Sequence, residues 1–440
     1  MKYSEIIKKG LELGLEEIEL FERSSVSNRL TLFEGKVDSY NINEIKSLSI
    51  RASYQGKMNY ISTESFTDED ILECLKTLKD GAPYLSSENP ESIYDGSGEY
   101  NEVHNEESDF DQIPLNEKID LLKGVEAKIL AKDPRFIKVQ AVYSERASIT
   151  KLINSKGLDL QKEDAYCMFY ANVVGLQDGQ TVSKAEGDVS IKFKDLNPDL
   201  VVEKVTEKVL NALGAGFVET GSYPAVFDRD VATSILQAFT SVFSGMSAMR
   251  KMSILIGKEG QKVFGDNITI IDDPFTDKAL FKEAFDDEGV PCKAKKLVEN
   301  GVFNGFMHTL KTAKFMNVEP TGNGGRGNGS AMPGPTNLYL QEGEYSKEDM
   351  FATIEKGVYI TEVAGLHAGL NPISGNFNVQ SSGFLIENGK LSRPITLFVL
   401  SSNFFELLNQ VEMIGNDIEP KFSGVAAPCL KVKNVTISGK

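Results

Sequence analysis

Side chains able to do chemistry are few in this chain of 440 residues, and they are scattered. Its four cysteines lack the C-x-x-C spacing of zinc sites and redox pairs, so we expect reduced and mostly buried thiols. The three histidines, His104, His308 and His367, are also far apart in the sequence. His308 or His367 could act as a general base, but no serine or cysteine in a recognisable nucleophile setting accompanies them. A structural or solvent-facing role is the favoured interpretation of both.

A glycine-rich loop, TGNGGRGNGSAMPGP, occupies residues 321–335. Its glycines could expose backbone N–H groups to an anion, and Arg326 could pair with a carboxylate or a phosphate. The loop lacks the Lys-Ser/Thr ending of a phosphate-binding P-loop and the strand-to-helix setting of a dinucleotide fingerprint. We therefore expect a flexible or partly ordered surface loop. A contact to a peptide or a partner is the second interpretation, and a nucleotide cradle is the weakest.

An acidic run, Asp286-Asp287-Glu288, is followed by Gly289. Carboxylate oxygens are the ligands that hard cations prefer, so the run could hold a metal ion. Adjacent residues of a strand point to opposite faces, which argues against three converging ligands. A tight turn before the next strand is the favoured interpretation.

The element expected to organise the second half of the chain is a helix within residues 228–260. Asp228 or Asp230 can cap its start, because a short carboxylate accepts a hydrogen bond from an otherwise unpaired backbone N–H. Apolar residues recur there every three or four positions, which predicts one apolar face on a helix, buried in a core. The apolar positions are Val231, Ile235, Phe239, Val242, Phe243, Met246 and Met249.

The sequence of the first half of the chain predicts strands flanked by helices, in two similar successive units. Residues 17–62 show the alternation and the glycine turns of hairpins, and a helix follows from Thr67. After a second helix, the strand pattern returns, and an E-R-x-S step occurs at 22–25 and again at 145–148. This favours an internally duplicated unit of strands plus helix, with chance similarity as the alternative. Between the two units, residues 83–111 are acidic and aperiodic, which predicts a surface excursion or linker.

Glycines and a proline within 214–224 predict a domain boundary. We expect an N-terminal α+β domain at 1–217 and a β-rich, largely antiparallel C-terminal domain with a few helices at 218–440. Asn-Gly pairs at 300–301 and 388–389 predict hairpins, because both positions of a type I′ turn need positive φ. The fold class predicted is thus α+β.

Composition excludes several function classes. Hydrophobic residues make up 41% and charged residues 25%, as in globular proteins. The formal charge of −17 would repel nucleic acid and anionic membranes, so we expect no direct contact with either. The N-terminus has no apolar run of signal-peptide length, and no segment approaches the roughly 20 apolar residues of a membrane span. A cytoplasmic location is expected.

Long ordered stretches of the sequence resemble the TldD/PmbA family, also known as modulators of DNA gyrase. The resemblance covers essentially the whole chain and implies an N-terminal α+β domain, a large β-rich C-terminal domain and assembly as dimers. For the TldD/TldE pair, in which TldE is PmbA, it implies an intracellular metallopeptidase that trims small unfolded peptides, including a microcin precursor and an antitoxin. The matching stretches are QAVYSERAS, DVATSILQAFTSVFSG, AFDDEGVPCKAKKLVENGVFNGFMHTLKTA, the glycine-rich loop, AGLNPISGNFNVQSSGFLIENGKLSRPI and VEMIGNDIE.

TldD-type members of the family carry H-E-x-x-x-H on the helix that matches residues 228–260. Two imidazoles hold zinc there, and the glutamate takes a proton from the zinc-bound water. The match puts Gln237 at the first histidine, Ala238 at the glutamate and Val242 at the second histidine. None of these three residues is a histidine or a glutamate. Cys429, in addition, does not fall where the cysteine ligand of the family is expected. The resemblance therefore implies the PmbA/TldE branch, with no metal and no other cofactor.

On this resemblance we expect a non-catalytic subunit that pairs with a TldD-like catalytic chain and helps to enclose a chamber for peptides. Two alternatives stay open. The chain could be a homodimeric protein that binds peptides or proteins without a catalytic partner, or a peptidase with an unrecognised site that needs no zinc. Residues expected to line the substrate path or a partner interface are His308, Asn323, Gly324, Gly325 and Arg326.

Overall fold

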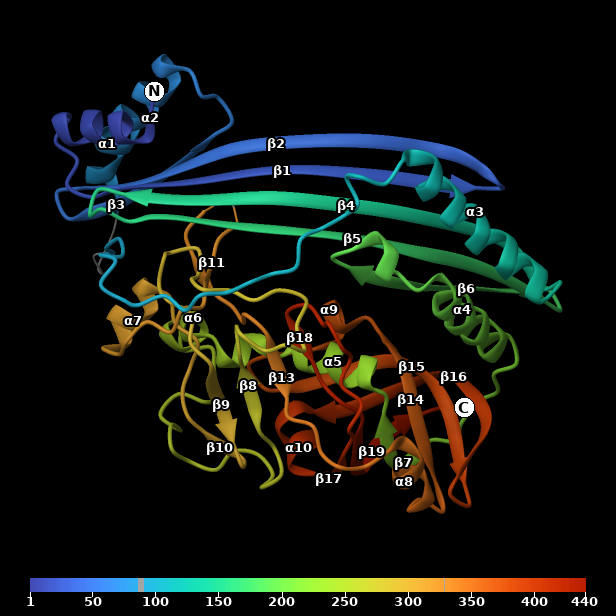
Figure 1. Cartoon of the computed structure of the whole chain (residues 1–440). Helices are drawn as coiled ribbons and strands as arrows, with labels where there is room; N and C mark the ends of the chain where they lie inside the picture. The colour runs from blue at the N-terminus through green and yellow to red at the C-terminus, as the bar shows by residue number, and fades with distance from the viewer. Residues whose placement is uncertain (86–90, 328) are drawn as a thin grey trace.

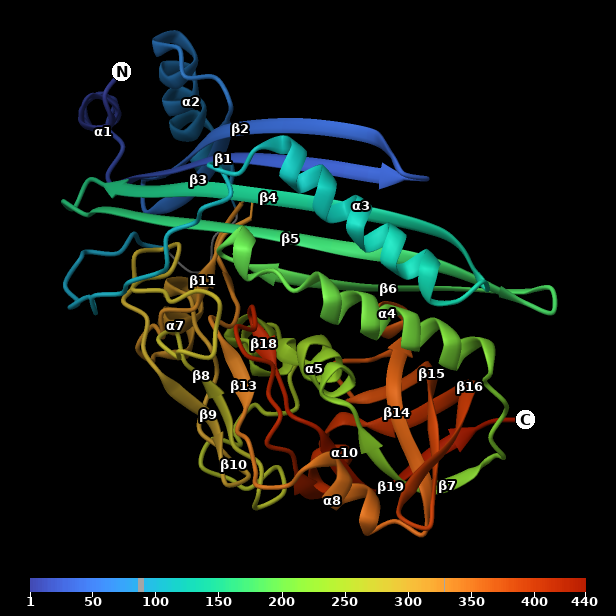
Figure 2. The same ribbon diagram turned by 45° about the vertical axis from the view of Figure 1, so that its right-hand side comes forward.

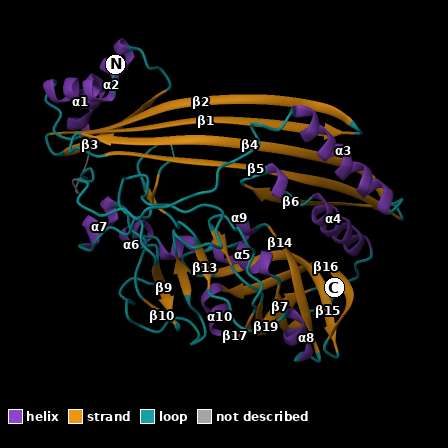
Figure 3. Ribbon diagram, viewed as in Figure 1, coloured by secondary structure: helices purple, strands orange, loops and turns teal. Residues whose placement is uncertain are grey.

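The computed structural model describes residues 1–85, 91–327 and 329–440. A long antiparallel sheet from the first half of the chain lies over a body of shorter strands, helices and loops from the second half (Figure 1). Strands make up most of the regular structure in both layers (Figure 3). The predicted α+β class is therefore confirmed. The division at residue 217 stays a prediction.

The N-terminal sheet has six strands in the order β3-β2-β1-β4-β5-β6, and all neighbours are antiparallel. Two helices pack at one end of it and two at the other (Figure 2). The strands are β1 (Ile18–Phe33), β2 (Lys36–Tyr54), β3 (Lys57–Thr63), β4 (Phe136–Asn154), β5 (Asp159–Gln177) and β6 (Gln180–Ser190). The helices are α1 (Tyr3–Glu12), α2 (Asp68–Gly81), η1 (Ala82–Tyr84), α3 (Leu115–Lys132), η2 (Phe193–Asp195) and α4 (Pro198–Leu213).

The two halves of this sheet are related by a local two-fold axis. Strands β1 and β4 pair at its centre, and Ser25 lies directly opposite Ser148 in their register. These serines are the last residues of the two E-R-x-S motifs. Equivalent positions of the two repeats therefore lie opposite each other, as they do at the local two-fold axis of an antiparallel strand pair. The helix that follows each set of strands has a side-chain cap: the side chains of Thr67 and Asn197 accept hydrogen bonds from backbone N–H groups. The arrangement supports a duplicated unit.

The segment between the repeats lacks helices and strands over residues 91–111, as predicted, but it does not run free over the surface. The side chain of Asn105 exchanges two hydrogen bonds with the backbone of Lys282, at 2.8 and 3.1 Å. Figure 1 shows the segment passing between the sheet and the C-terminal body. Residues 86–90 of the predicted linker lie outside the described residues.

The C-terminal body contains a six-stranded sheet, a five-stranded sheet and a two-stranded ribbon around one large apolar core. Pairing is antiparallel except between β7 and β14 and between β13 and β18. Both predicted Asn-Gly turns have positive φ at both positions. The strands are β7 (Gly221–Phe227), β8 (Ile270–Asp272), β9 (Lys295–Glu299), β10 (Val302–Phe303), β11 (Gly324–Gly325), β12 (Met332–Pro333), β13 (Leu338–Leu340), β14 (Lys356–Ala364), β15 (Asn376–Glu387), β16 (Lys390–Asn403), β17 (Val411–Ile414), β18 (Val425–Ala426) and β19 (Leu430–Ser438).

The single helix predicted within residues 228–260 is wrong, because the chain there forms three short helices. Its apolar positions from Val231 to Met246 are buried as predicted. Ser244, however, is extended and bridges to Met307, and the backbone N–H of Gly245 donates to the Met307 carbonyl at 2.8 Å. This tertiary pairing separates the 3-10 turn at 240–243 from the helix that begins at Gly245. The helices of the C-terminal body are α5 (Arg229–Ala238), η3 (Thr240–Phe243), α6 (Gly245–Met249), α7 (Leu310–Met316), α8 (Lys347–Ala352), α9 (Leu366–Gly369) and α10 (Phe404–Asn409).

The sequence around His308, GVFNGFMHTL, has the apolar pattern of a strand, but strand β10 ends at Phe303 and His308 immediately precedes the cap of α7. Of the helices in residues 1–85, 91–327 and 329–440, none has the length and apolar character needed to span a membrane.

Candidate functional site

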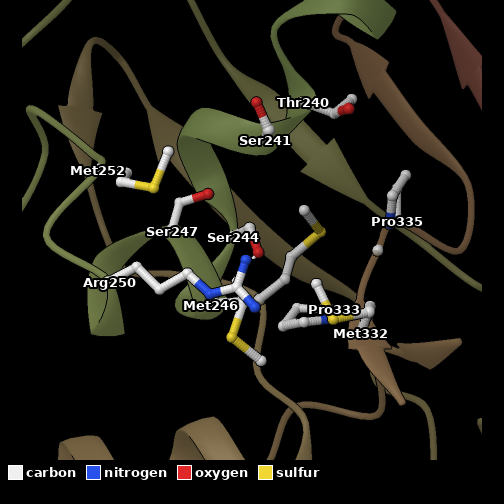
Figure 4. A pocket seen from close by; sticks show the side chains of 12 residues that line it. Thr240, Ser241, Ser244, Met246, Ser247, Arg250, Met252, Met332, Pro333 and Pro335 are labelled. Atoms are coloured by element: carbon white, nitrogen blue, oxygen red, sulfur yellow. Dashed lines mark hydrogen bonds between the residues drawn. The ribbon is translucent and has the colours of Figure 1, made fainter. Parts of the chain in front are cut away.

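A groove of about 1160 Å³ lies between the N-terminal sheet and the C-terminal body. Strands β1, β4 and β5 contribute one side of it, and residues 281–287 together with parts of the glycine-rich loop contribute the other. A smaller pocket of about 300 Å³ lies against the broken helix, between η3, α6 and the ribbon strand β12 (Figure 4). Gly334 and Pro335 line both cavities, so the pocket adjoins the groove.

Asn323 anchors the start of the glycine-rich loop. Its side chain is 2% exposed and uses both its amide nitrogen and its oxygen. The nitrogen donates to Asp272 at 2.7 Å and to the Gly334 carbonyl at 2.9 Å. The oxygen accepts from Lys295 at 2.9 Å and from Thr321 at 2.7 Å. A buried amide with all these partners fixes the backbone around it.

The prediction of a flexible surface loop is therefore wrong for residues 321–326, where every residue except Thr321 and Gly325 is buried. Residue 328 lies outside the described residues. Gly324 donates its N–H to Asp286 at 2.7 Å, and a Cβ at that position would come within 3.0 Å of the same carboxylate. The close approach of backbone to carboxylate explains this glycine. Asn323, Gly324 and Gly325 all line the groove.

The acidic run forms the predicted tight turn: the N–H of Gly289 donates to the Asp286 carbonyl, and Gly289 has a φ of 82°. What the sequence did not reveal is that all three carboxylates are buried. Burial and the neighbouring Glu288 raise the pKa of Asp286 to about 8, while three backbone N–H groups that donate to its carboxylate oppose the rise. Burial would also raise the pKa of Asp287, but Lys162 and other donors outweigh it and hold that pKa below its usual value.

A buried ionic network joins this turn and the glycine-rich loop to the N-terminal sheet. Arg51 bonds to Glu288 at 3.1 Å and to Glu19 at 3.1 Å, and Glu19 also pairs with Arg326. The backbone N–H of Arg326 donates to Asp287 at 2.9 Å. Buried charges need such partners, so the acidic run is a signal that cations must lie nearby. Arg51 lies on a strand 237 residues away from Glu288, and no local pattern identifies it as the partner.

His308 is 5% exposed, and Met307 beside it lines the pocket. Its ring nitrogen Nδ1 lies 3.2 Å from the Thr312 hydroxyl, and its backbone N–H donates to Thr321 at 2.7 Å. Burial lowers the pKa of His308 to about 4, so the ring is neutral at physiological pH. Its ring packs behind Gly245, where an added Cβ would come within 2.4 Å of Nδ1. This arrangement fits a structural histidine rather than a general base.

The positions matched to the zinc motif do not fit the metal. Gln237 is exposed, Ala238 is half-buried, and Val242 is 2% exposed within the core. An amide is a poor zinc ligand, and the other two side chains cannot ligate at all. Throughout the part of the chain that the structure describes, no three His, Cys, Asp or Glu side chains are grouped to hold a metal ion. Cys429 instead donates to Asp417 at 3.0 Å, and burial raises the pKa of its thiol.

Comparisons with known families match three models to almost the whole chain. The PmbA/TldA metallopeptidase domain 1 matches residues 18–82, the central domain of that family matches 108–213, and its C-terminal domain matches 220–439.

Individual relatives show the same extent of similarity. An uncharacterized protein of Methanocaldococcus jannaschii is 29% identical, over 96% of this chain and 98% of its own. The metalloprotease PmbA of Escherichia coli O157:H7 is 23% identical over 94% of this chain and 90% of its own. Among solved structures, a Thermotoga maritima protein described as a modulator of DNA gyrase has a TM-score of 0.88 and 28% identity, with 99% of both chains covered. TldE from Thermococcus kodakarensis also has a TM-score of 0.88 over 99% of both chains, and at 24% identity it shows the shared fold.

Proposed function

Because the chain belongs to the PmbA/TldD metallopeptidase family, we propose that it is the non-catalytic, metal-free subunit of a TldD/TldE-type peptidase. In this role it pairs with a TldD-like catalytic chain and holds small unfolded peptides in the groove beneath its sheet. Its expected location is the cytoplasm, where such peptides arise.

The observation that carries this proposal is a large groove beside a site without catalytic side chains. The groove of about 1160 Å³ is of the size that ligand-binding clefts have. His308, whose neighbour Met307 lines the pocket that adjoins the groove, is buried and neutral at physiological pH. At the helix where a catalytic member has its zinc ligands, this chain has Gln237, Ala238 and Val242. Those residues can pack or contact a peptide, but they cannot activate water.

An exposed apolar patch on the N-terminal sheet supports the presence of a partner. The core under α1 and α2 contains Leu20, and the core under α3 and α4 contains Leu30, so both helix pairs cover the same face of β1. Between them, Val26 lies on that face and is 45% exposed. Apolar side chains clustered on an exposed face mark interaction surfaces. By register, the other members of the patch are Tyr40, Ile42 and Ile149, which are 41%, 61% and 45% exposed. Val26 and Ile149 also line the groove, so the patch borders it.

The test is a reconstitution with a TldD-like chain from the same source. We expect the purified chain alone to retain no stoichiometric zinc and to cleave no peptide, and cleavage to appear when the partner is added. Robust, chelator-sensitive cleavage by this chain alone would refute the proposal. A homodimer that binds peptides when no partner is present would favour the alternative of a binding protein.

A patch variant adds a structural control to the reconstitution. Ile42→Asp is expected to weaken complex formation, measured by size-exclusion chromatography with light scattering, because it puts a charge in the apolar patch. Ile373→Asp is the matched control, since Ile373 is 45% exposed and belongs to the C-terminal body rather than to the patch.

A further inference from the structure

The pocket against the broken helix has an unusual lining. Four methionines, from α6, from the turn after it, from the segment before α7 and from β12, contribute thioether groups to its wall. Arg250 is the one charged residue among the twelve that line it, and none of the lining residues is acidic. Figure 4 shows the guanidinium of Arg250 reaching toward Ser244 and Met246. The four methionines are Met246, Met252, Met307 and Met332.

A specific helix ending places Arg250 at this pocket. Helix α6 ends at Met249, and Lys251 has the left-handed φ of 58°. The N–H of Met252 donates to the Ser247 carbonyl at 2.7 Å, and the N–H of Lys251 donates to the Ala248 carbonyl at 2.9 Å. These two bonds and the left-handed residue define a Schellman motif, in which Arg250 is the C-cap. The side chains on either side of the left-handed residue, Arg250 and Met252, both line the pocket.

Arg250 is an exposed arginine, and it differs in its partners from five other arginines of the chain, though not from Arg146. Within residues 1–85, 91–327 and 329–440, its guanidinium forms neither an ion pair nor a hydrogen bond. Five other arginines each pair with a carboxylate: Arg23, Arg51, Arg135, Arg229 and Arg326. A guanidinium presents paired N–H donors that match a carboxylate, so an unpaired one in an acid-free pocket favours a carboxylate ligand.

We propose that this pocket binds a carboxylate-bearing residue of a peptide, with the carboxylate on Arg250 and an adjacent apolar side chain among the four thioethers. The inference rests on the proposed function, because the pocket adjoins the peptide groove through Gly334 and Pro335. The thioethers are flexible and polarizable, so they accept apolar side chains of several shapes. A volume of about 300 Å³ is at the lower end for ligand pockets and suits one end of a peptide rather than a folded protein.

The carboxylate has two possible sources, the free C-terminus of the peptide and an acidic side chain. Fluorescence anisotropy on the full purified chain, without partner, distinguishes them with three labelled peptides of one sequence. The first ends in a leucine with a free acid, the second ends in the same leucine as an amide, and the third is an amide with aspartate before the leucine. We expect the free acid to bind at least about tenfold more tightly than the plain amide. If the aspartyl amide binds as tightly as the acid, the pocket takes an acidic side chain.

Two variants test whether Arg250 and the thioether wall create the preference. Arg250→Gln is expected to remove the difference between acid and amide. Arg393→Gln is the matched control, because Arg393 is exposed, lies outside the pocket and donates to a backbone carbonyl rather than to a carboxylate. Met332→Asp changes a side chain that is 44% exposed and should fold normally, and its negative charge is expected to lower affinity for the acid selectively.

Equal affinity for all three peptides, no binding of any of them, or an unchanged acid preference in Arg250→Gln would each overturn the pocket proposal. If the partner still restores peptide cleavage in that case, the proposed function survives without this pocket. Conversely, chelator-sensitive cleavage by the chain alone would refute the proposed function while the acid preference could still be measured in the presence of chelator.

Discussion

The guanidinium of Arg326, in the glycine-rich loop, forms an ion pair with the carboxylate of Glu19, on the first strand of the N-terminal sheet, although 307 residues separate them. The two side chains are 4% and 0% exposed. Glu19 also bonds to Arg51, which continues the contact to Glu288 of the acidic turn. A chain of buried ion pairs therefore connects the wall of the groove to the sheet, and each inner charge in it is shared by two partners.

Removal of the Glu19 charge should destabilise the protein strongly. Glu19→Gln leaves two buried guanidinium groups without their shared carboxylate, and an uncompensated buried charge costs about 3–5 kcal/mol. Urea denaturation would measure the loss. The control is Glu362→Gln, because Glu362 pairs with Lys184 of the sheet but is 47% exposed, and such pairs contribute about 1 kcal/mol or less. Similar losses in both variants would contradict a special role for the buried network.

The contribution of His308 to the stability of the protein should fall below about pH 6.5. Burial lowers its folded-state pKa from the usual value of 6.5 to about 4, so the unfolded chain binds a proton more readily over this interval. The favourable contribution is present above pH 6.5 and is lost as the pH falls through 4, by up to about 3 kcal/mol. In denaturant titrations at several pH values, His308→Gln should flatten this part of the profile. His104→Gln, at a residue that is 83% exposed, should leave the profile unchanged.

Position 245 should not accept a side chain. In Gly245→Ala the new methyl group would lie 2.4 Å from Nδ1 of His308 and 2.9 Å from the Met307 carbonyl. Overpacking of this kind costs about 1–3 kcal/mol. The matched control is Gly124→Ala in α3, where an added Cβ meets nothing within 4 Å and should stabilise the helix by about 0.5–1 kcal/mol. Thermal unfolding should therefore shift in opposite directions, and a shift of the same sign would contradict the packing described.

Lys251→Gly should stabilise the protein, because Lys251 has a φ of 58° and a left-handed residue with a side chain costs roughly 1–2 kcal/mol. The added freedom of glycine in the unfolded chain offsets part of this gain. Peptide affinity should not change, since the Schellman bonds that place Arg250 are kept. The opposite substitution is Gly257→Ala, where φ is 71° and space is free, and it should destabilise the protein through the backbone alone.

Features that depend on neighbouring residues could be predicted from the sequence. The cap residues Thr67 and Asn197, the hairpins at the two Asn-Gly pairs and the turn at Gly289 all follow from local backbone preferences. The duplicated unit was visible as a repeated E-R-x-S step, and its serines pair at the centre of the sheet. The absence of zinc chemistry at Gln237, Ala238 and Val242 follows from residue type, once the family is recognised.

Contacts between distant segments were decided by the tertiary structure. The apolar spacing of residues 231–246 correctly predicts a buried face. It wrongly predicts one continuous helix, because α5 ends at Ala238 and the bridge from Ser244 to Met307 separates η3 from α6. Likewise, the glycine-rich loop has the composition of a mobile surface segment, yet buried partners such as Glu19 hold it in place. Composition and periodicity report short-range preferences. Charge pairing and backbone bridges across hundreds of residues depend on which surfaces the folded chain brings together.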